Sequence, residues 1–285
     1  MTIDPEEERA NARERWEAIA PQWEAGVDAY QRGALPVAHW MVEALEPQPG
    51  QTVLELAAGR GDVGLLAAEL LVPGGKLILT DGAEAMVEMA KRHAATLGLP
   101  DGLVEFKPME LEWVDEKLAT IDGVLCRFGY QHAVDPEAAL REARRVLKPG
   151  GRIVLATWAP PEENPWLSGL PAAAESLGLA EPSPPGAPGA FALSDPTQVA
   201  DLLEDAGFDE PRIEPIDLVF NAPSLDAWWD TLREFSSTMR PLLESLSPAD
   251  HYNLRDAAEA EWAPYVAQDG SVSIPGRAFG ATATA

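Results

Sequence analysis

The stretch VLELAAGRGDVG, residues 53–64, constrains the fold more strongly than any other part of the chain. An apolar run leads to Glu55, glycines follow at 59, 61 and 64 in the spacing G-x-G-x-x-G, and the helix-forming run LLAAELL comes next. Each glycine loses much backbone entropy on folding, so three of them within six residues are expected where the backbone turns tightly against a ligand. The stretch therefore predicts the first strand, turn and helix of an α/β sheet.

Strands and helices are expected to alternate from residue 52 onward, which predicts a Rossmann-like, doubly wound and mostly parallel sheet. Its ligand crevice should lie at the C-terminal ends of the strands. The expected strands are TVLEL, KLILTD, LVEFKPM, GVLCRFG, RIVLATWA, RIEPIDLVF and SVSIPGRAFGATATA. The expected helices cover residues 5–24, 34–46, 62–71, 84–97, the segments PEAALREARRVL and DPTQVADLLEDAGF, and much of 224–266.

We expect a single domain over residues 1–285. Within it, residues 1–46 should form N-terminal helices and residues 47–160 the cofactor-binding core. Residues 161–192 are rich in proline, alanine and glycine, and residues 222–270 are helical in pattern. Long excursions of this kind are usually functional, so we interpret both as insertions that form a helical cap over the substrate.

The composition excludes several classes of function. The formal net charge of -26 repels phosphate backbones and anionic lipid surfaces, so no nucleic-acid partner is expected. No apolar run approaches the roughly 18 residues of a membrane span, so no membrane insertion is expected. The single cysteine, Cys126, cannot form an internal disulfide, and the acidic N-terminus does not resemble a signal peptide. A cytoplasmic protein is the expectation.

The charges beside the glycine turn indicate which ligand it holds. A dinucleotide would place its pyrophosphate on this turn, where the carboxylate of Glu55 repels it and Arg60 is the only basic residue in the turn. A ligand with an ammonium group and a fixed cation suits Glu55 and Asp62 better. S-adenosylmethionine is such a ligand.

Further polar residues follow the next strands. Asp81 can accept both ribose hydroxyls, or it can cap the following helix. Met86 can pack on the adenine face or in the core. Glu110 is placed to accept the adenine amino group, with the amide of Leu111 beside it.

The fourth strand ends in CRFGYQHAVDP, so Arg127, Tyr130 and His132 are expected to face the crevice. His132 is the first candidate for a catalytic base and Tyr130 the second, although a structural role for His132 remains equally open. The surface is the favoured place for His251. Five tryptophans lie in or beside the predicted cap, where they could line an apolar pocket or bury the cap helices: Trp158, Trp166, Trp228, Trp229 and Trp262.

From about Trp16 to Gly151 the chain resembles the class I S-adenosylmethionine-dependent methyltransferases, a group that includes the ubiquinone/menaquinone C-methyltransferases. The resemblance depends on five segments: ERWEAIAPQW, VLELAAGRG, LTDGAEAMVEMA, RFGYQHAVD and LREARRVLKPGGRIVLA. It implies S-adenosylmethionine as cofactor, S-adenosylhomocysteine as product and an antiparallel last strand.

The resemblance also implies roles for single residues. It assigns Glu55, Ala57, Gly59 and Gly61 to the methionyl part, Asp81, Gly82 and Met86 to ribose and adenine, Glu110 and Leu111 to the adenine edge, Arg127 and Phe128 to the sulfonium side, and Trp23 to a cover over the cofactor. Two residues depart from the family pattern. Ala57 replaces the usual glycine, which is tolerable if its φ stays negative, and Glu110 replaces the commoner aspartate.

The predicted function is methyl transfer to a small, aromatic or hydrophobic acceptor. Two alternatives stay open: an NAD(P)-dependent oxidoreductase, and a protein that binds S-adenosylmethionine without catalysis. An antiparallel hairpin of the last two strands would favour the methyltransferase class over the oxidoreductase. A homodimer through the N-terminal helices or the C-terminal insertion is a further expectation.

Overall fold

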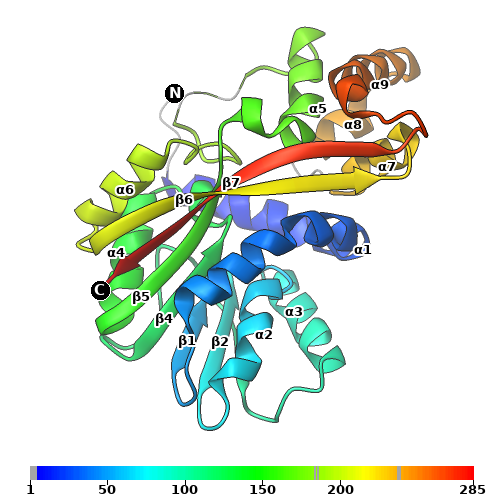
Figure 1. Ribbon diagram of the computed structural model, residues 1–285. Helices are drawn as coiled ribbons and strands as arrows, with labels where there is room; N and C mark the ends of the chain where they lie inside the picture. Colours follow the sequence, from blue (N-terminus) through cyan, green and yellow to red (C-terminus); the bar gives the residue numbers. More distant parts are fainter. Residues whose placement is uncertain (1–4, 183, 185, 236–238) are drawn as a thin grey trace.

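A seven-stranded sheet runs through the molecule (Figure 1) in the order β3-β2-β1-β4-β5-β7-β6. The computed structural model describes residues 5–182, 184, 186–235 and 239–285; residues 1–4, 183, 185 and 236–238, parts of the predicted N-terminal and cap segments, lie outside the described residues. The strands are β1 (Thr52–Glu55), β2 (Lys76–Asp81), β3 (Val104–Pro108), β4 (Ile121–Arg127), β5 (Leu147–Trp158), β6 (Asp209–Ala222) and β7 (Val272–Thr284).

The topology confirms the predicted Rossmann-like, mostly parallel sheet. Strands β1 to β5 pair in parallel, whereas β7 runs antiparallel to both β5 and β6. The last two strands therefore form the antiparallel hairpin expected of the methyltransferase class. The chain order reverses between β1 and β4, and an open α/β sheet binds its ligand beyond the carboxyl ends of the strands at such a point.

Helices cover both faces of the sheet. Helices α2 (Asp62–Ala68) and α3 (Glu84–Thr96) pack with α1 on one face, and α4 (Pro136–Val146) and α6 (Pro196–Asp205) cover the other (Figure 1). Short 3-10 turns η1 (Glu69–Leu71), η2 (Tyr130–His132), η3 (Pro161–Glu163) and η4 (Ala263–Tyr265) join these elements. Asp195 caps α6, since its carboxylate accepts a hydrogen bond from the Thr197 amide at 2.8 Å.

The N-terminal region forms one long helix, α1 (Pro5–Leu45), so the prediction of two separate helices is wrong. Glycine and proline lower the helix propensity of the segment around residues 25–36. Packing reverses this local preference, because Tyr30, Ala34 and Val37 are buried in the core. At Gly33 a Cβ atom would lie 2.3 Å from the ring of Phe220, so the glycine lets helix and sheet approach closely.

The two insertions form helices that lie together beyond β6 and β7 (Figure 1). The first contains α5 (Pro165–Ser176). The second contains α7 (Leu225–Phe235), α8 (Arg240–Ser245) and α9 (Pro248–Trp262). Trp262 is fully buried between α9 and α5, and its indole nitrogen donates a hydrogen bond to the Pro165 carbonyl at 2.9 Å. The insertions therefore pack against one another.

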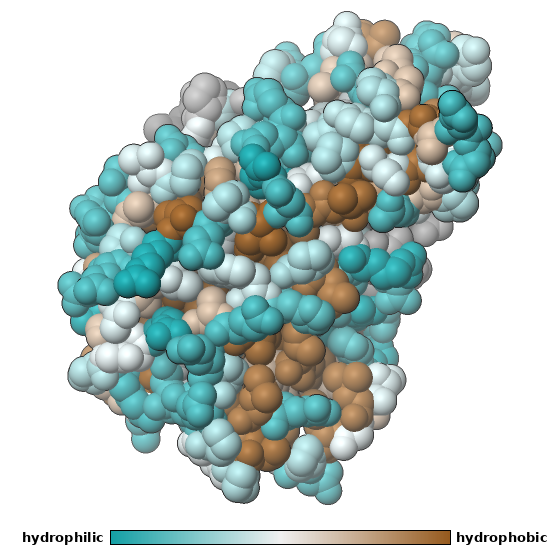
Figure 2. Space-filling view, in the orientation of Figure 1, coloured by the Kyte–Doolittle hydropathy of each residue, from teal (hydrophilic) through white to brown (hydrophobic). Residues whose placement is uncertain are grey.

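The face shown in Figure 2 is mostly hydrophilic, with hydrophobic side chains gathered over α2 and in patches above it. Leu66, Leu70 and Val72 are exposed on α2 and the turn after it. Within the described ranges, no helix combines the length and the apolar character needed to cross a bilayer.

Candidate functional site

A cavity opens at the C-terminal ends of β1, β2 and β4, beneath the first half of α1. Its lining comes from the glycine turn after β1, from the segments that follow β2, β3 and β4, and from α1 and α5. Every residue predicted to bind the cofactor lines this cavity except Gly61. The roles predicted for these residues stay predictions.

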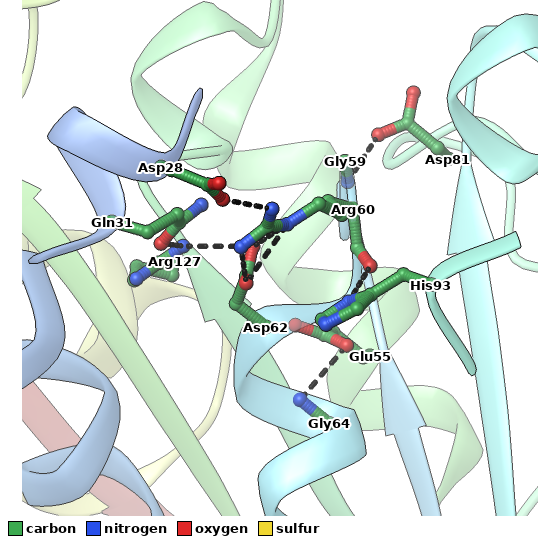
Figure 3. A network of polar contacts seen from close by, with 10 residues as sticks. All are labelled: Asp28, Gln31, Glu55, Gly59, Arg60, Asp62, Gly64, Asp81, His93 and Arg127. Carbon is green, nitrogen blue, oxygen red and sulfur yellow. Dashed lines mark hydrogen bonds and ion pairs between the residues drawn. The ribbon is translucent and has the colours of Figure 1, made fainter. Parts of the chain in front are cut away.

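The glycine turn is held by hydrogen bonds to the neighbouring strand. The Gly59 amide donates to the Asp81 carboxylate at 2.9 Å (Figure 3), and the Ala58 amide donates to the Thr80 carbonyl at 2.9 Å. Gly59 has a φ of +55°, and no atom lies within 4 Å of the position of a Cβ there. A ligand can therefore approach the backbone closely at this point.

Gly61 has a packing role, and its predicted role in the ligand site stays a prediction. It precedes α2 with a φ of +79°, and a Cβ atom would lie 2.4 Å from the Leu79 side chain. Glycine is needed here for its left-handed backbone and for the contact of the helix with β2.

Glu55 lies beneath the glycine turn rather than in open solution. Its side chain is almost fully buried, and its Oε2 atom accepts a hydrogen bond from the Gly64 amide at 3.0 Å (Figure 3). Burial raises the pKa of the Glu55 carboxyl to about 8, against the lowering effect of the nearby Arg127 charge. The carboxyl still lines the cavity, where a cationic ligand would favour its ionised form.

Two residues of the site have left-handed backbone without being glycine. Ala57 has a φ of 49°, so the condition of a negative φ, under which alanine was tolerable here, is not met; Phe128 has a φ of 59°. Hydrogen bonds on either side impose this conformation: the Leu56 amide donates to Leu125, and the Phe128 amide donates to Ala156. Strained backbone of this kind clusters at functional sites.

Asp81 ends β2 and organises the turn beside it. Its two carboxylate oxygens accept hydrogen bonds from the amides of Gly59 and Ala83, at 2.9 Å and 3.0 Å. Burial raises the pKa of Asp81 to about 6. The alternative role as the N-cap of the following helix is wrong, because α3 begins at Glu84 after Ala83, and the Glu17 carboxylate of α1 accepts hydrogen bonds from the first amides of α3.

The first half of α1 is joined to the far end of the cavity by ion pairs. Arg13 lies 2.9 Å from Glu110, the residue predicted to meet the adenine. The Arg9 Nε atom donates to Glu112 at 2.8 Å, and Glu112 also accepts from the Val134 amide at 2.8 Å. The sequence interpretation missed these α1 residues. Their spacing of four residues at 9, 13 and 17 places them on one helix face, which is the signal that could have found them.

Arg127 lies at the centre of the cavity, beside the glycine turn. Its Nη2 atom donates to Gln31 of α1 at 2.7 Å and lies 3.9 Å from Asp62 (Figure 3). Asp62 is itself engaged by Arg60 at 2.8 Å, and Arg60 also contacts Asp28 of α1 at 2.6 Å. Arg127 and Arg60 thus connect the glycine turn to α1.

The two candidate bases differ in position. His132 lines the cavity, and its ring packs edge-on against Trp16 with centroids 5.6 Å apart. Burial lowers the pKa of His132 to about 4, so the imidazole is neutral at physiological pH. Tyr130 is buried in the core cluster on the opposite face of the sheet, so the expectation that it faces the crevice is wrong. His251 lies at a separate surface depression and contacts the Leu243 carbonyl.

An aromatic compartment forms the remaining end of the cavity. Phe128 stacks on Trp158 with ring centroids 3.7 Å apart, and Trp158 meets Trp166 edge-on at 5.1 Å. Leu170 of α5 and Leu232 of α7 complete this apolar wall. Of the five tryptophans in or beside the predicted cap, Trp158 and Trp166 line the cavity, whereas Trp228, Trp229 and Trp262 are buried in the core.

The cavity thus has a polar end and an aromatic end, with Arg127 between them. The polar end presents carboxylates at the ends of successive strands and an open backbone at Gly59. This set suits a ligand with hydroxyl, amino and cationic groups, and Trp23 of α1 also lines the cavity. The described residues contain no group of three or more histidine, cysteine or acidic side chains placed to hold a metal ion.

Comparison with known proteins shows which class of protein the chain resembles. Residues 53–151 match the model of the methyltransferase domain family. The ubiquinone/menaquinone biosynthesis C-methyltransferase UbiE of Acidiphilium cryptum is 32% identical over 155 residues, which cover 53% of this chain and 60% of that protein. Over these residues the chain is therefore similar to methyltransferase domains, including that of the UbiE group, as its motifs predict. It spans less than two thirds of the length of the curated relatives it matches.

Solved structures share the fold over nearly the whole chain. The phosphoethanolamine N-methyltransferase 2 of Haemonchus contortus, in complex with S-adenosylhomocysteine, aligns with a TM-score of 0.57 at 17% identity, covering 96% of this chain and 59% of that chain. The [4+2]-cyclase SpnF aligns with a TM-score of 0.61 at 15% identity, covering 95% and 94% of the two chains. The fold is thus common to proteins named for different reactions.

Proposed function

We propose that this protein binds S-adenosylmethionine in the polar end of the cavity and transfers its methyl group to a small aromatic or hydrophobic acceptor. The proposal depends mainly on one observation: the polar end and the aromatic end of the cavity meet at Arg127 and Phe128. Acidic strand ends suited to a cationic, hydroxyl-bearing cofactor lie on one side, and stacked aromatic rings lie on the other. The methyltransferase domain over residues 53–151 supports the assignment of the polar end.

Several residues of the chain would position the cofactor. Glu55 and Asp81 would hold the amino and ribose groups of the cofactor, and Glu110 with Leu111 would meet its adenine edge. Glu110 must exchange or share its ion pair with Arg13 to do so. When bound, the cofactor supplies the methyl group: a lone pair of the acceptor bonds to the methyl carbon as the carbon–sulfur bond breaks, leaving a neutral thioether. Orientation at near-attack distance is the main contribution the protein makes to such a displacement.

The aromatic compartment would bind the acceptor and exclude water. Phe128, Trp158 and Trp166 present flat apolar surfaces, and stacking on such surfaces favours planar molecules. His132 is neutral and is the candidate to accept a proton from the acceptor, although a base with a pKa of about 4 is weak. The arrangement therefore favours acceptors that reach the cavity with little need for deprotonation.

The oxidoreductase alternative is less well supported. The antiparallel β6–β7 hairpin is typical of methyltransferases. In addition, Glu55 occupies the space directly under the glycine turn, where its carboxyl would weaken the binding of a pyrophosphate. Binding without catalysis is left as an outcome of the test.

The test is calorimetric titration with S-adenosylmethionine, S-adenosylhomocysteine and NADH. Wild type, Asp81→Ala and the control Asp101→Ala, which removes an exposed acid from a surface turn, would be compared. We expect micromolar binding of both sulfur nucleosides to wild type and to the control. Asp81→Ala should weaken it by at least about tenfold, the loss expected when a charged hydrogen-bond partner is removed.

Tight NADH binding without a response to the sulfur nucleosides would refute the proposal. Binding of the sulfur nucleosides without methylation of any phenol, quinol or small amine in an acceptor screen would favour the non-catalytic alternative.

A further inference from the structure

The guanidinium group of Arg127 has an unusual environment for a buried charge. Its side chain is 9% exposed, and its Nη1 atom has no hydrogen-bond partner among the described residues. The Nη2 atom is held by Gln31 at 2.7 Å, so the group is fixed in orientation. A buried charged donor that lacks a partner costs free energy, which a ligand oxygen could recover.

The positive charge of Arg127 is weakly compensated. Asp62 is the nearest acid, at 3.9 Å, but Arg60 holds the Asp62 carboxylate through two closer contacts of 2.8 Å and 3.1 Å. Glu55 also faces this region, but its Oε2 atom already accepts a hydrogen bond from the Gly64 amide at 3.0 Å. Among the described residues, no carboxylate is therefore hydrogen-bonded to Arg127.

This charge lies at the border of the aromatic compartment. The guanidinium carbon is 5.9 Å from the ring centroid of Tyr30 and 5.9 Å from that of Phe128. The Phe128 ring continues into the stack with Trp158. An apolar, flat body placed against these rings would bring a substituent at its edge to Arg127.

We propose that Arg127 selects acceptors that carry an anionic oxygen, a carboxylate or a phenolate, on an aromatic or apolar body. This inference rests on the proposed function, because it names the acceptor class for the same cavity. Arg127 is then a specificity-determining residue: its guanidinium group donates to the anionic oxygen while the aromatic rings bind the body. Hydrogen bonds in which both partners are charged are about twice as strong as neutral ones, so the preference should be large.

The overall charge of the protein does not oppose this assignment. A formal charge of -26 repels anions at long range, but such repulsion is screened beyond about 10 Å at ordinary ionic strength. Inside the cavity, the charge of the nearest groups determines whether an anion binds. The methionyl carboxylate of the cofactor is the competing partner for Arg127, and the experiment must separate the two.

The experiment measures binding rather than turnover. Two pairs of probes are titrated into the protein saturated with S-adenosylhomocysteine: 2-naphthoate against 2-naphthamide, and 4-nitrophenolate against 4-nitroanisole at mildly alkaline pH. Each pair shares an aromatic body and differs in the anionic oxygen. We expect at least one anion to bind about tenfold more tightly than its neutral counterpart, which corresponds to about 1.4 kcal/mol. The pair that shows the preference identifies the anion as carboxylate or phenolate.

Variants then assign the preference to Arg127. Arg127→Gln should abolish it, Arg127→Lys should retain part of it through the charge, and Arg92→Gln should leave it unchanged. Arg92 is the matched control because it lies on the surface in an ion pair with Glu24. Thermal unfolding of each variant reports whether the fold survives. If a variant does not fold, the preference of wild type for the anionic probe over its neutral counterpart still tests the inference.

Three results would overturn the inference. Equal binding of anionic and neutral probes to wild type would do so, as would an unchanged preference in a folded Arg127→Gln variant. The third concerns the cofactor: if Arg127→Gln weakens S-adenosylhomocysteine but not 5′-methylthioadenosine, which lacks the carboxylate, Arg127 binds the cofactor instead. Failure of wild type to bind S-adenosylhomocysteine would refute the proposed function, and the probe pairs would then be compared without it.

Discussion

The Glu55 carboxylate accepts a hydrogen bond from the Gly64 amide at 3.0 Å, and a Cβ atom on residue 64 would lie 2.3 Å from the same oxygen. Glu55 therefore fills the space that a side chain at position 64 would need. The third glycine of the G-x-G-x-x-G spacing is explained by this contact inside the protein, without a ligand.

The first prediction concerns Gly64→Ala. Gly64 lies inside α2, where alanine would normally stabilise the helix by about 1 kcal/mol. Here the added methyl group must displace Glu55 and also approaches Leu77 at 3.0 Å. We expect the free energy of unfolding to fall by about 1–3 kcal/mol, the usual cost of overpacking, as measured by urea titration.

The coupling between the two residues provides the control. The double variant Glu55→Ala with Gly64→Ala should lose less stability than the sum of the single variants, because the small side chain at 55 makes room for the new methyl group. An increase in stability for Gly64→Ala alone would contradict the packing argument.

The second prediction is a pH dependence of stability due to Glu55. Its pKa is about 8 in the folded protein and 4.5 in the reference state, so the folded state binds the proton more tightly. Stability from this group is fully present below about pH 4.5 and is lost as pH rises toward 8. Relative to Glu55→Gln, wild type should lose about 4 kcal/mol between these limits.

Urea titrations of wild type and Glu55→Gln at several pH values measure this difference, in which the other titrating groups largely cancel. Parallel pH profiles for the two proteins would show that Glu55 is ionised in the folded state. Saturating S-adenosylmethionine should reduce the difference if its ammonium group favours the ionised carboxylate.

Much of the fold could be predicted from the sequence because its determinants are local. The strands are short apolar runs, and the turns between them contain glycine or proline, so β1 to β5 were expected within a few residues of their observed bounds. The strand-end position of Asp81 likewise follows from its place after KLILT. The unbroken α1 was not predictable locally, because Phe220, nearly 190 residues away, occupies the space above Gly33.

The wrong predictions for the site also come from contacts between residues that are distant in sequence. The left-handed φ of Ala57 is imposed by hydrogen bonds to β2 and β4 on either side of it. Tyr130 follows β4 closely in sequence, but the turn η2 directs its ring into the core on the opposite face of the sheet. The position of a residue in the sequence shows that it lies near the crevice. The conformation of the turn that contains it determines where its side chain points.

The third prediction concerns the protonation of His132. Burial and, to a smaller extent, the charge of Arg15 lower the pKa of this imidazole from 6.5 to about 4. The unfolded state therefore binds the proton more tightly, so wild type should lose up to about 2 kcal/mol relative to His132→Asn as pH falls from 6.5 to 4. NMR titration of the imidazole, assigned by its absence in His132→Asn, should show neutral histidine throughout pH 6–8. A midpoint above about pH 6 would contradict the burial of the ring beside Trp16.

The last prediction concerns the docking of α1 over the cavity. Arg9 joins α1 to Glu112 through its Nε atom at 2.8 Å, and the Glu112 side chain is only 11% exposed. Arg15 also forms an ion pair, but with Glu8 on α1 itself, at 3.4 Å. Both substitutions remove one positive charge from the same helix, yet only Arg9→Ala removes a contact with the rest of the protein. We expect Arg9→Ala to weaken docking by about 1 kcal/mol and to speed amide hydrogen exchange over residues 5–24 about fivefold, while Arg15→Ala leaves it unchanged. Equal exchange in the two variants would mean that apolar packing of Ile19 and Ala20, rather than the ion pair, holds the first half of α1 in place.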